Sequence, residues 1–217
     1  METGERTTVG GVVDRFGRHR TCAPGEILFL EGDHSEQVYV CVAGRVRIFL
    51  TLPSGRELLI GMKVPGEEFG ELSAIDGRHR SASAVAVGPT VVAMLAADRF
   101  RGLVNESPEL SAAVCQSLSA QLRRANDRLV TRNTNSATER TGRMLVELSS
   151  MMMRHGSTSV SYGVDMTQSE LADWIGATRE ATARALARFR AAGLIETCRG
   201  QIVVLDVVGL DRFIARL

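Results

Sequence analysis

Short apolar runs separated by turn residues fill the first half of the chain. The runs are rich in β-branched side chains, and the breaks between them carry turn signals such as Gly25, Gly44 and Gly88-Pro89. Strands this short, at near-regular spacing, indicate a sandwich or a barrel rather than alternating βα units. The sequence therefore predicts a small antiparallel barrel within residues 1–107, with strands at 27–30, 38–42, 46–50, 58–62, 82–87 and 91–95.

The pattern changes to a helical period after residue 107. A capping serine, a proline at the first helical position and an early acid, Ser107-Pro108-Glu109, predict a helix, and we place this helix and a hinge at 108–134. Apolar residues then recur every three or four positions between charged flanks, as in a coiled-coil seam: Cys115, Leu118, Leu122, Ala125 and Leu129. Such a seam favours a symmetric dimer. The alternative is a helix that lies on its own barrel.

Two capping boxes mark helix starts in a second domain, which we place at 135–217. The first is Ser136-Ala137-Thr138-Glu139, and the second is Thr167-Gln168-Ser169-Glu170. Gly176 ends the short second helix, and Thr178 can cap a further helix that runs to about residue 192. Two short helices joined through a glycine turn predict a helix-turn-helix.

A hairpin follows this pair of helices. Residues 194–197 alternate in polarity, Arg199-Gly200 supplies a turn, and residues 201–205 return. The sequence thus predicts a wing beside the helix-turn-helix.

Composition places the chain among ordinary folded proteins, with 44% hydrophobic and 24% charged residues over 217 positions. No apolar stretch approaches the roughly 20 residues of a membrane-spanning helix, and the N-terminus lacks the apolar core of a signal peptide. We therefore expect a cytoplasmic protein without a membrane partner. A formal net charge of +1 hides a skew, because Lys63 is the only lysine among 26 basic residues. Arginine suits bidentate contacts with phosphate and guanine, although a GC-rich genome also produces such a skew.

Enzyme chemistry finds no support in the motifs. The chain has no glycine-rich nucleotide loop, no nucleophile elbow and no spaced metal ligands. Its four cysteines, at 22, 41, 115 and 198, lack the spacing of a zinc or iron–sulfur site. We expect a protein that is not an enzyme and that holds no metal or haem.

The helix after Thr178 divides into two faces on a helical wheel. Small and apolar residues occupy one face: Ala181, Thr182, Ala185, Leu186 and Phe189. Arg179, Glu180, Arg184 and Arg188 share the other face with Ala183 and Ala187. Small residues let a helix approach base pairs, arginine can donate twice to guanine, and glutamate can accept from cytosine. The plainer alternative is an ordinary solvated surface.

Residues 167–184 resemble the DNA-binding motif of the cyclic AMP receptor protein and fumarate–nitrate regulator family. The resemblance implies an α+β fold with an N-terminal antiparallel, jelly-roll-like β-roll, a long dimerisation helix and a C-terminal winged helix-turn-helix. It also implies that Arg179 and Arg184 read guanines of a TGTGA-type half-site and that Glu180 contacts the cytosine side of a base pair. Gln168 and Arg199 would contact phosphates, and Thr178 and Arg188 belong to the same DNA-facing set.

Residues 69–83 resemble the phosphate-binding cassette of the same family. A cyclic nucleotide needs an acid for the ribose 2′-hydroxyl, a cation for the phosphate and small residues whose amides approach it. Glu71, Arg80 and the pair Ser81-Ala82 stand at the family positions, within Gly70-Glu71-Leu72 and Arg80-Ser81-Ala82, and Gly70 permits the tight backbone. The alternative is a β-roll that keeps the cassette but has lost its ligand.

Recognition of the base departs from the family pattern. The family uses hydroxyl side chains on the long helix, where this chain has Ala125 and Asn126, and only Asn126 can hydrogen-bond adenine. Cyclic AMP is the expected effector, and cyclic GMP or no ligand are the alternatives. The resemblance then implies a homodimeric, ligand-switched transcription regulator that binds double-stranded DNA and works with RNA polymerase. The competing hypothesis is a constitutive DNA-binding or nucleoid-shaping protein.

Overall fold

The structure is a computed structural model that describes residues 7–55, 57–134, 136–154, 162–164, 167–198 and 200–217. Side chains are described over the same residues except 128–134, 151–154, 162 and 164. The chain divides into two compact units, Met1–Arg124 and Ala125–Leu217. None of the helices in the described ranges is both long and apolar enough to cross a membrane.

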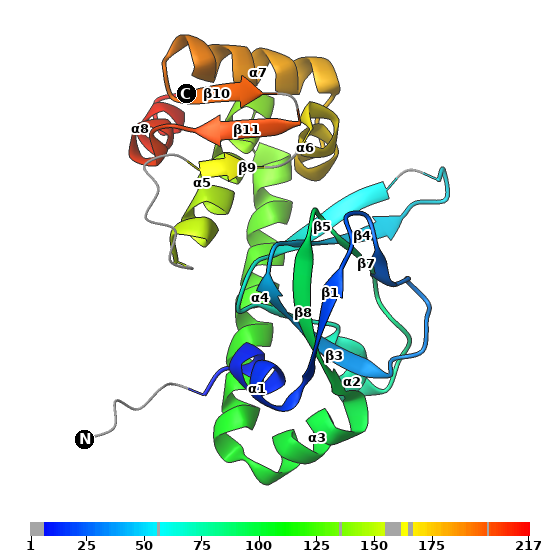
Figure 1. The fold of residues 1–217 in the computed structure, drawn as a ribbon. Coiled ribbons are helices and arrows are strands. Elements are labelled where there is room, and N and C mark those ends of the chain that lie inside the picture. Colours follow the sequence, from blue (N-terminus) through cyan, green and yellow to red (C-terminus); the bar gives the residue numbers. More distant parts are fainter. Residues whose placement is uncertain (1–6, 56, 135, 155–161, 165–166, 199) are drawn as a thin grey trace, which may run out of the picture. The chain divides into compact units, whose positions relative to one another are not determined.

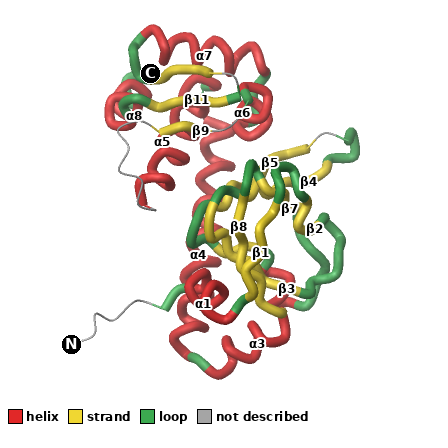
Figure 2. Tube along the Cα trace, viewed as in Figure 1, coloured by secondary structure: helices red, strands yellow, loops and turns green. Residues whose placement is uncertain are grey.

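Two antiparallel sheets form the centre of the first unit, as predicted (Figures 1 and 2). Their strand orders are β1-β8-β3-β6 and β2-β7-β4-β5. The strands are β1 (Arg18–Cys22), β2 (Ile27–Phe29), β3 (Gln37–Ala43), β4 (Val46–Thr51), β5 (Glu57–Lys63), β6 (Glu68–Phe69), β7 (Ser83–Ala86) and β8 (Thr90–Ala96). The helices are α1 (Val9–Phe16), α2 (Glu71–Asp76), α3 (Ala97–Glu106) and α4 (Pro108–Thr134), of which α4 continues into the second unit.

Strand β3 separates the two cores of this unit because its side chains alternate between them. Tyr39 and Cys41 lie in a core between the two sheets, with Phe69 and Ala84. Val38 and Val40 point the other way, into a core with residues of α1, α2, α3 and α4. A strand buried on both faces reads as a continuous apolar run, and this explains why residues 38–42 show no polar alternation.

Helix α4 begins as the sequence predicts, with the Ser107 hydroxyl accepting a hydrogen bond from the Leu110 amide at 3.1 Å. Leu110 and Val114 are buried in the core of the first unit, and Leu118 packs against that core while partly exposed. Leu122 is 63% exposed. The first turns of α4 therefore lie on the barrel, whereas the side chain of Leu122 is left largely exposed by the described residues of this unit.

The second unit has the helices and wing of the predicted winged helix-turn-helix. Its helices are α5 (Ala137–Arg154), α6 (Gln168–Ile175), α7 (Arg179–Ala191) and α8 (Val207–Ile214). A sheet of order β10-β11-β9 is formed by β10 (Ile195–Cys198), β11 (Gln201–Val204) and β9 (Tyr162–Val164). The α+β fold class is thus confirmed.

Close helix packing in this unit depends on a glycine in α5. A Cβ atom at Gly142 would lie 2.6 Å from side-chain atoms of Ile214 and 3.1 Å from Phe189. Glycine at this position lets α5 approach both α7 and α8, which hold the buried side chains Phe189 and Ile214. Leu145 of α5 and Leu171 of α6 are fully buried as well, so the helices of the helix-turn-helix pack against α5.

Candidate functional site

The phosphate-binding cassette begins at a glycine that the geometry requires. Gly70 is the N-cap of α2 with a φ of 76°, in the left-handed region. A Cβ atom at this position would lie 2.6 Å from Nη1 of Arg80. Both the backbone conformation and the proximity of Arg80 therefore disfavour a side chain at position 70.

Arg80 is the buried cation of the cassette, with 4% of its surface exposed. Nη1 donates to the carbonyl oxygen of Gly70 at 2.7 Å and to Oγ of Ser73 at 3.3 Å, and Nη2 donates to the carbonyl oxygen of Gln37 at 2.5 Å. Its guanidinium carbon lies 4.2 Å from the ring centroid of Phe29. Burial lowers the pKa of Arg80.

Part of the donor capacity of Arg80 is unused. A guanidinium carries five N–H donors, and three of them have described acceptors. The buried Nε atom has no hydrogen-bond partner in the described parts of the chain. No carboxylate within the same ranges forms an ion pair with Arg80. The cassette therefore presents a buried positive charge with free donors.

Glu71 is the second buried charged group of the cassette, with 4% of its surface exposed. Its Oε1 accepts a hydrogen bond at 2.9 Å from Nε2 of Gln121 on α4. The other residues that the sequence selects differ in exposure, since Leu72 is 43% exposed, Ser81 is exposed and Ala82 is buried. The structure thus brings Gly70, Glu71 and Arg80 together. Asn126 is exposed and lies in the second unit.

Several residues of the site do not stand out in the sequence. Gln37, Ser73 and Gln121 bind the two charged groups, and Phe29 lies against Arg80. The backbone of Arg80 also bonds to the loop that follows β2. The Gly32 amide donates to the Arg80 carbonyl oxygen, and the Arg80 amide donates to the Asp33 carbonyl oxygen, both at 2.9 Å. Apart from Ser73, which lies within the cassette, these residues are far from their partners in the sequence, so no local motif could have predicted the contacts.

The first helix of the helix-turn-helix, α6, is fixed at both ends. Thr167 and Glu170 form the predicted capping box, with Oγ1 of Thr167 accepting from the Glu170 amide at 3.2 Å. Gly176 ends α6 with a φ of 63°. Arg140 of α5 donates to the carbonyl oxygens of Ile175 at 3.0 Å and Gly176 at 3.3 Å. The turn between the two helices is thereby held to α5.

Helix α7 begins at Thr178, whose hydroxyl accepts from the Ala181 amide at 3.2 Å, and it presents two distinct faces. The buried face consists of Thr182, Ala185, Leu186 and Phe189. Arg179, Glu180, Arg184 and Arg188 are exposed, as are Thr178 and Ala187, while Ala183 is half-buried. Gln168, at the start of α6, is also half-buried. The arginine-rich face of α7 is therefore accessible to a ligand.

The charge of Glu180 is stabilised by its position at the start of α7. Hydrogen bonds from its own backbone amide and from Thr178 lower the pKa of its carboxyl group, and Arg179 and Arg184 act in the same direction. Glu180 can therefore only accept hydrogen bonds at neutral pH.

The wing follows α7, with Ile195 to Cys198 of β10 paired to Gln201 to Val204 of β11. Arg199, predicted to contact phosphate, and the side chain of Leu129, predicted in the seam, lie outside what the structure describes. The third strand, β9, was not expected from the sequence. It extends the wing into a three-stranded sheet.

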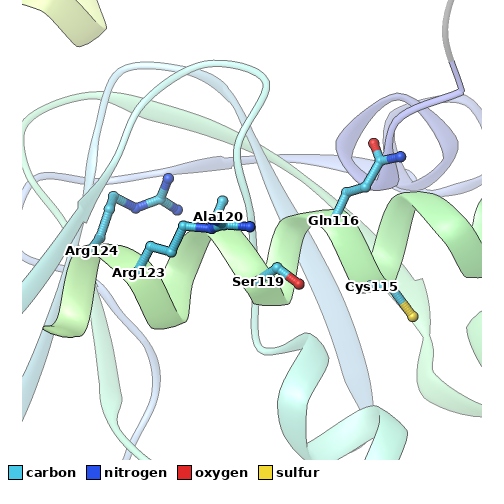
Figure 3. A pocket seen from close by; sticks show the side chains of 6 residues that line it. All are labelled: Cys115, Gln116, Ser119, Ala120, Arg123 and Arg124. Atoms are coloured by element: carbon cyan, nitrogen blue, oxygen red, sulfur yellow. The ribbon is translucent and has the colours of Figure 1, made fainter.

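An open hollow lies along α4, and Figure 3 shows the side chains of this helix that line it. It is lined by Cys115, Gln116, Ser119, Ala120, Arg123 and Arg124. Within the described ranges, no cluster of three or more histidine, cysteine or acidic side chains could hold a metal ion.

Comparisons with known proteins agree with both halves of this description. A model of the cyclic nucleotide-binding domain matches residues 19–107, and a model of the Crp-like helix-turn-helix domain matches residues 139–213. Over 188 residues the chain is 29% identical to the CRP-like cAMP-activated global transcriptional regulator of Mycobacterium tuberculosis, covering 87% of this chain and 84% of that protein.

Two further proteins are similar along most of the chain. The nitrogen fixation regulation protein FixK of Bradyrhizobium diazoefficiens is 27% identical over 202 residues, which cover 93% of this chain and 84% of that protein. The structure of FixK2 from Bradyrhizobium japonicum matches with a TM-score of 0.79 at 23% identity, over 90% of this chain and 96% of that one. This last comparison shows the shared fold.

Proposed function

Because the chain belongs to the cyclic AMP receptor protein and fumarate–nitrate regulator family of transcription regulators, we propose that it is a cyclic AMP-responsive member. Regulators of this family bind DNA and act as dimers, and the family is not one of enzymes. In this proposal a homodimer binds double-stranded DNA when the nucleotide occupies the β-roll. The nucleotide shifts the population toward the DNA-competent arrangement because it binds that arrangement more tightly.

The burial and the unused donors of Arg80 are the observations that support a nucleotide ligand. Among the described residues, Arg80 is a buried cation that forms no ion pair and whose Nε–H has no acceptor, and such burial costs free energy that a bound anion would offset. An arginine with two free donors can hold two oxygens of a phosphate. The cyclic phosphate would bind here beside Ser81 and Ala82, and the ribose 2′-hydroxyl would donate to Glu71.

The choice of cyclic AMP rests on less specific support. The Mycobacterium tuberculosis relative is named as cAMP-activated, and Asn126 can both donate to and accept from an adenine edge. Cyclic GMP offers the same phosphate and ribose. Its binding is therefore the first competing outcome of the experiment.

Calorimetry of the full chain with cyclic AMP, cyclic GMP and linear AMP tests the ligand. We expect cyclic AMP to bind best and Arg80→Ala to abolish measurable binding, because truncating one partner of a buried charged pair costs about 2–5 kcal/mol. Arg78→Ala is the control, since Arg78 lies in the same loop with 86% of its side chain exposed. Arg80→Lys keeps the charge and checks that the fold is intact. A wild-type protein that binds none of these nucleotides, yet binds DNA, would instead support the constitutive alternative.

The DNA half of the proposal assigns base contacts to α7. A two-fold dimer meets a pseudo-palindrome, with recognition helices about 34–36 Å apart in successive major grooves. Arg179 and Arg184 would each donate to a guanine of a TGTGA-type half-site, and Glu180 would accept from cytosine. Gln168 and Arg199 would contact phosphates, Thr178 and Arg188 would complete the surface, and RNA polymerase would be the further partner.

Selection of bound sequences from a random pool tests these contacts. Loss of Arg179 or Arg184 should cost about 1–3 kcal/mol at one base pair and relax the preference there. Arg199→Ala should weaken binding to all sequences and flatten the salt dependence. Arg190→Ala is a matched control, because Arg190 lies on the same helix but donates to Thr197 of the wing. Recovered sites without two-fold TGTGA/TCACA symmetry would contradict the assignment.

A further inference from the structure

Two histidine rings lie against each other beside the cassette. His34 follows β2 in the loop that leads to β3, and His79 is the residue before Arg80. The centroids of the two rings are 4.6 Å apart, with an angle of 51° between the ring planes. Both residues are exposed, so a solute can reach them.

Backbone hydrogen bonds hold these two segments together. The Gly32 amide donates to the carbonyl oxygen of Arg80, and the Arg80 amide donates to that of Asp33, both at 2.9 Å. Each histidine adjoins a residue of this bridge. A ligand that binds both rings therefore requires little further ordering of the chain.

The ring nitrogens of this pair are not engaged elsewhere. Among the described residues, none forms a hydrogen bond or an ion pair with the ring of His34 or His79. By contrast, Nε2 of His19 lies 2.6 Å from a carboxylate oxygen of Asp14. The nitrogens of His34 and His79 are therefore available as ligands.

The separation of the rings matches that of two imidazoles on one metal ion. With metal–nitrogen bonds of about 2.0–2.1 Å and an angle of about 90–109° at the ion, the centroids of two such rings are roughly 4.5–5 Å apart. Imidazole is a ligand of zinc, copper and nickel, whereas magnesium and calcium take oxygen ligands. The pair therefore suits a divalent ion of the zinc type.

We propose that His34 and His79 bind an exchangeable divalent ion of this class, held by one nitrogen of each ring. The described residues offer no cluster of three or more ligands, so water completes the coordination and the ion exchanges readily, unlike an ion with four protein ligands. The ion ties the loop after β2 to the cassette, next to the backbone bridge at Arg80. Ligand spacing in the sequence gives no sign of this site, because only folding brings the two histidines together.

Side-chain NMR of the full chain tests the ligands, with Zn²⁺ as the probe. The chain has four histidines, so the ring signals of each can be assigned by their loss in a substitution variant. The double variant Cys115→Ser, Cys198→Ser is the background, because these exposed thiols are themselves possible zinc ligands. We expect the signals of His34 and His79 to shift together, with one affinity that calorimetry reproduces.

Removal of either ligand should weaken Zn²⁺ binding. In His34→Ala and in His79→Ala we expect a loss of at least about tenfold, since loss of an outer-shell partner alone costs about 10–100-fold in metal affinity. Both residues are exposed, so these variants keep the core intact. His19→Ala is the matched control and should bind Zn²⁺ as the background protein does. Equal affinity in all three variants, or ring shifts confined to other histidines, would overturn the site.

Amide hydrogen exchange tests whether the ion ties the two segments. The Gly32 and Arg80 amides form the bridge, so saturating Zn²⁺ should slow their exchange severalfold in the background protein, because opening must then also break a metal–nitrogen bond. In His79→Ala, Zn²⁺ should leave their exchange unchanged. Unchanged exchange in the Zn²⁺-saturated background protein would overturn the tie. Cyclic nucleotide enters neither experiment, so the result is independent of the proposed function.

Discussion

Gly70 is the residue on which the geometry of the pocket depends most directly. Gly70→Ala should weaken cyclic AMP binding by at least about tenfold, because the new methyl group would displace the Arg80 guanidinium, which we propose as the phosphate-binding group. Calorimetry checks this expectation. Gly77→Ala is the control, since Gly77 also has a positive φ, 72°, but its Cβ would meet nothing within 4 Å. Both variants should lose about 1–2 kcal/mol of stability from left-handed strain, so equal nucleotide affinities would contradict the role of Gly70.

A second prediction at the residue scale concerns the buried thiols. Burial raises the pKa of Cys41 to about 12, so its thiol is almost wholly protonated at pH 8, and burial likewise raises the pKa of Cys22. The thiolate is the reactive form. In the native protein at pH 8, iodoacetamide should therefore label exposed Cys198 and spare Cys41 and Cys22, with mass spectrometry locating the adducts. All three should react after denaturation, and rapid native labelling of Cys41 would be inconsistent with the β-roll core described above.

At the scale of the element, α6 depends on its capping box. Thr167→Ala removes the hydroxyl that accepts from the Glu170 amide and should lower the free energy of unfolding of the second unit by about 1 kcal/mol. Trp174, the only tryptophan of the chain, is buried in α6, so its fluorescence during urea unfolding reports on this unit. Ser169→Ala, an exposed first-turn residue, should leave the midpoint unchanged. If both variants unfold alike, the cap contributes nothing measurable.

How far the elements follow from sequence depends on whether their signals are local. The helix caps at Ser107, Thr167 and Thr178 could be predicted from the sequence, because each capping hydrogen bond joins residues three positions apart. Helix α3 was instead assigned to the barrel, since ten residues interrupted by Gly102 give little periodicity. Strand β9 is three residues long and acquires its identity by pairing with β11.

The residues of the candidate site also differ in whether a local sequence motif predicts them. Gly70, Glu71 and Arg80 stand in one short motif, which the sequence displays. Gln121 lies 50 residues from Glu71, and Gln37 lies 43 residues from Arg80. These partners are selected by the folding of the whole unit, so a glutamine on a helix gives no advance sign of its role.

At the scale of the whole molecule, an exposed apolar side chain on α4 predicts where the dimer interface lies. Leu122 is 63% exposed, whereas Leu118 already packs partly on its own barrel, so Leu122 is the better probe of a seam that would also contain Ala125 and Leu129. Leu122→Glu should convert a dimer into a monomer in sedimentation velocity, because it buries a charge at the two-fold axis. Ile27→Glu, at a 53% exposed residue of β2, should remain dimeric. A Leu122→Glu protein that stays dimeric would show that α4 is not the interface.

The three described hydrogen bonds of Arg80 have an evolutionary consequence. Because they join β3, the start of α2 and Ser73 without any nucleotide, selection for folding preserves this arginine in a lineage that stops sensing. The bond between Gln121 and Glu71 joins α4 only to the start of α2 and reaches no strand of the barrel, so substitutions should accumulate there first. Among descendants of this protein, paired change at positions 71 and 121 beside an invariant arginine would mark the branches that have become constitutive.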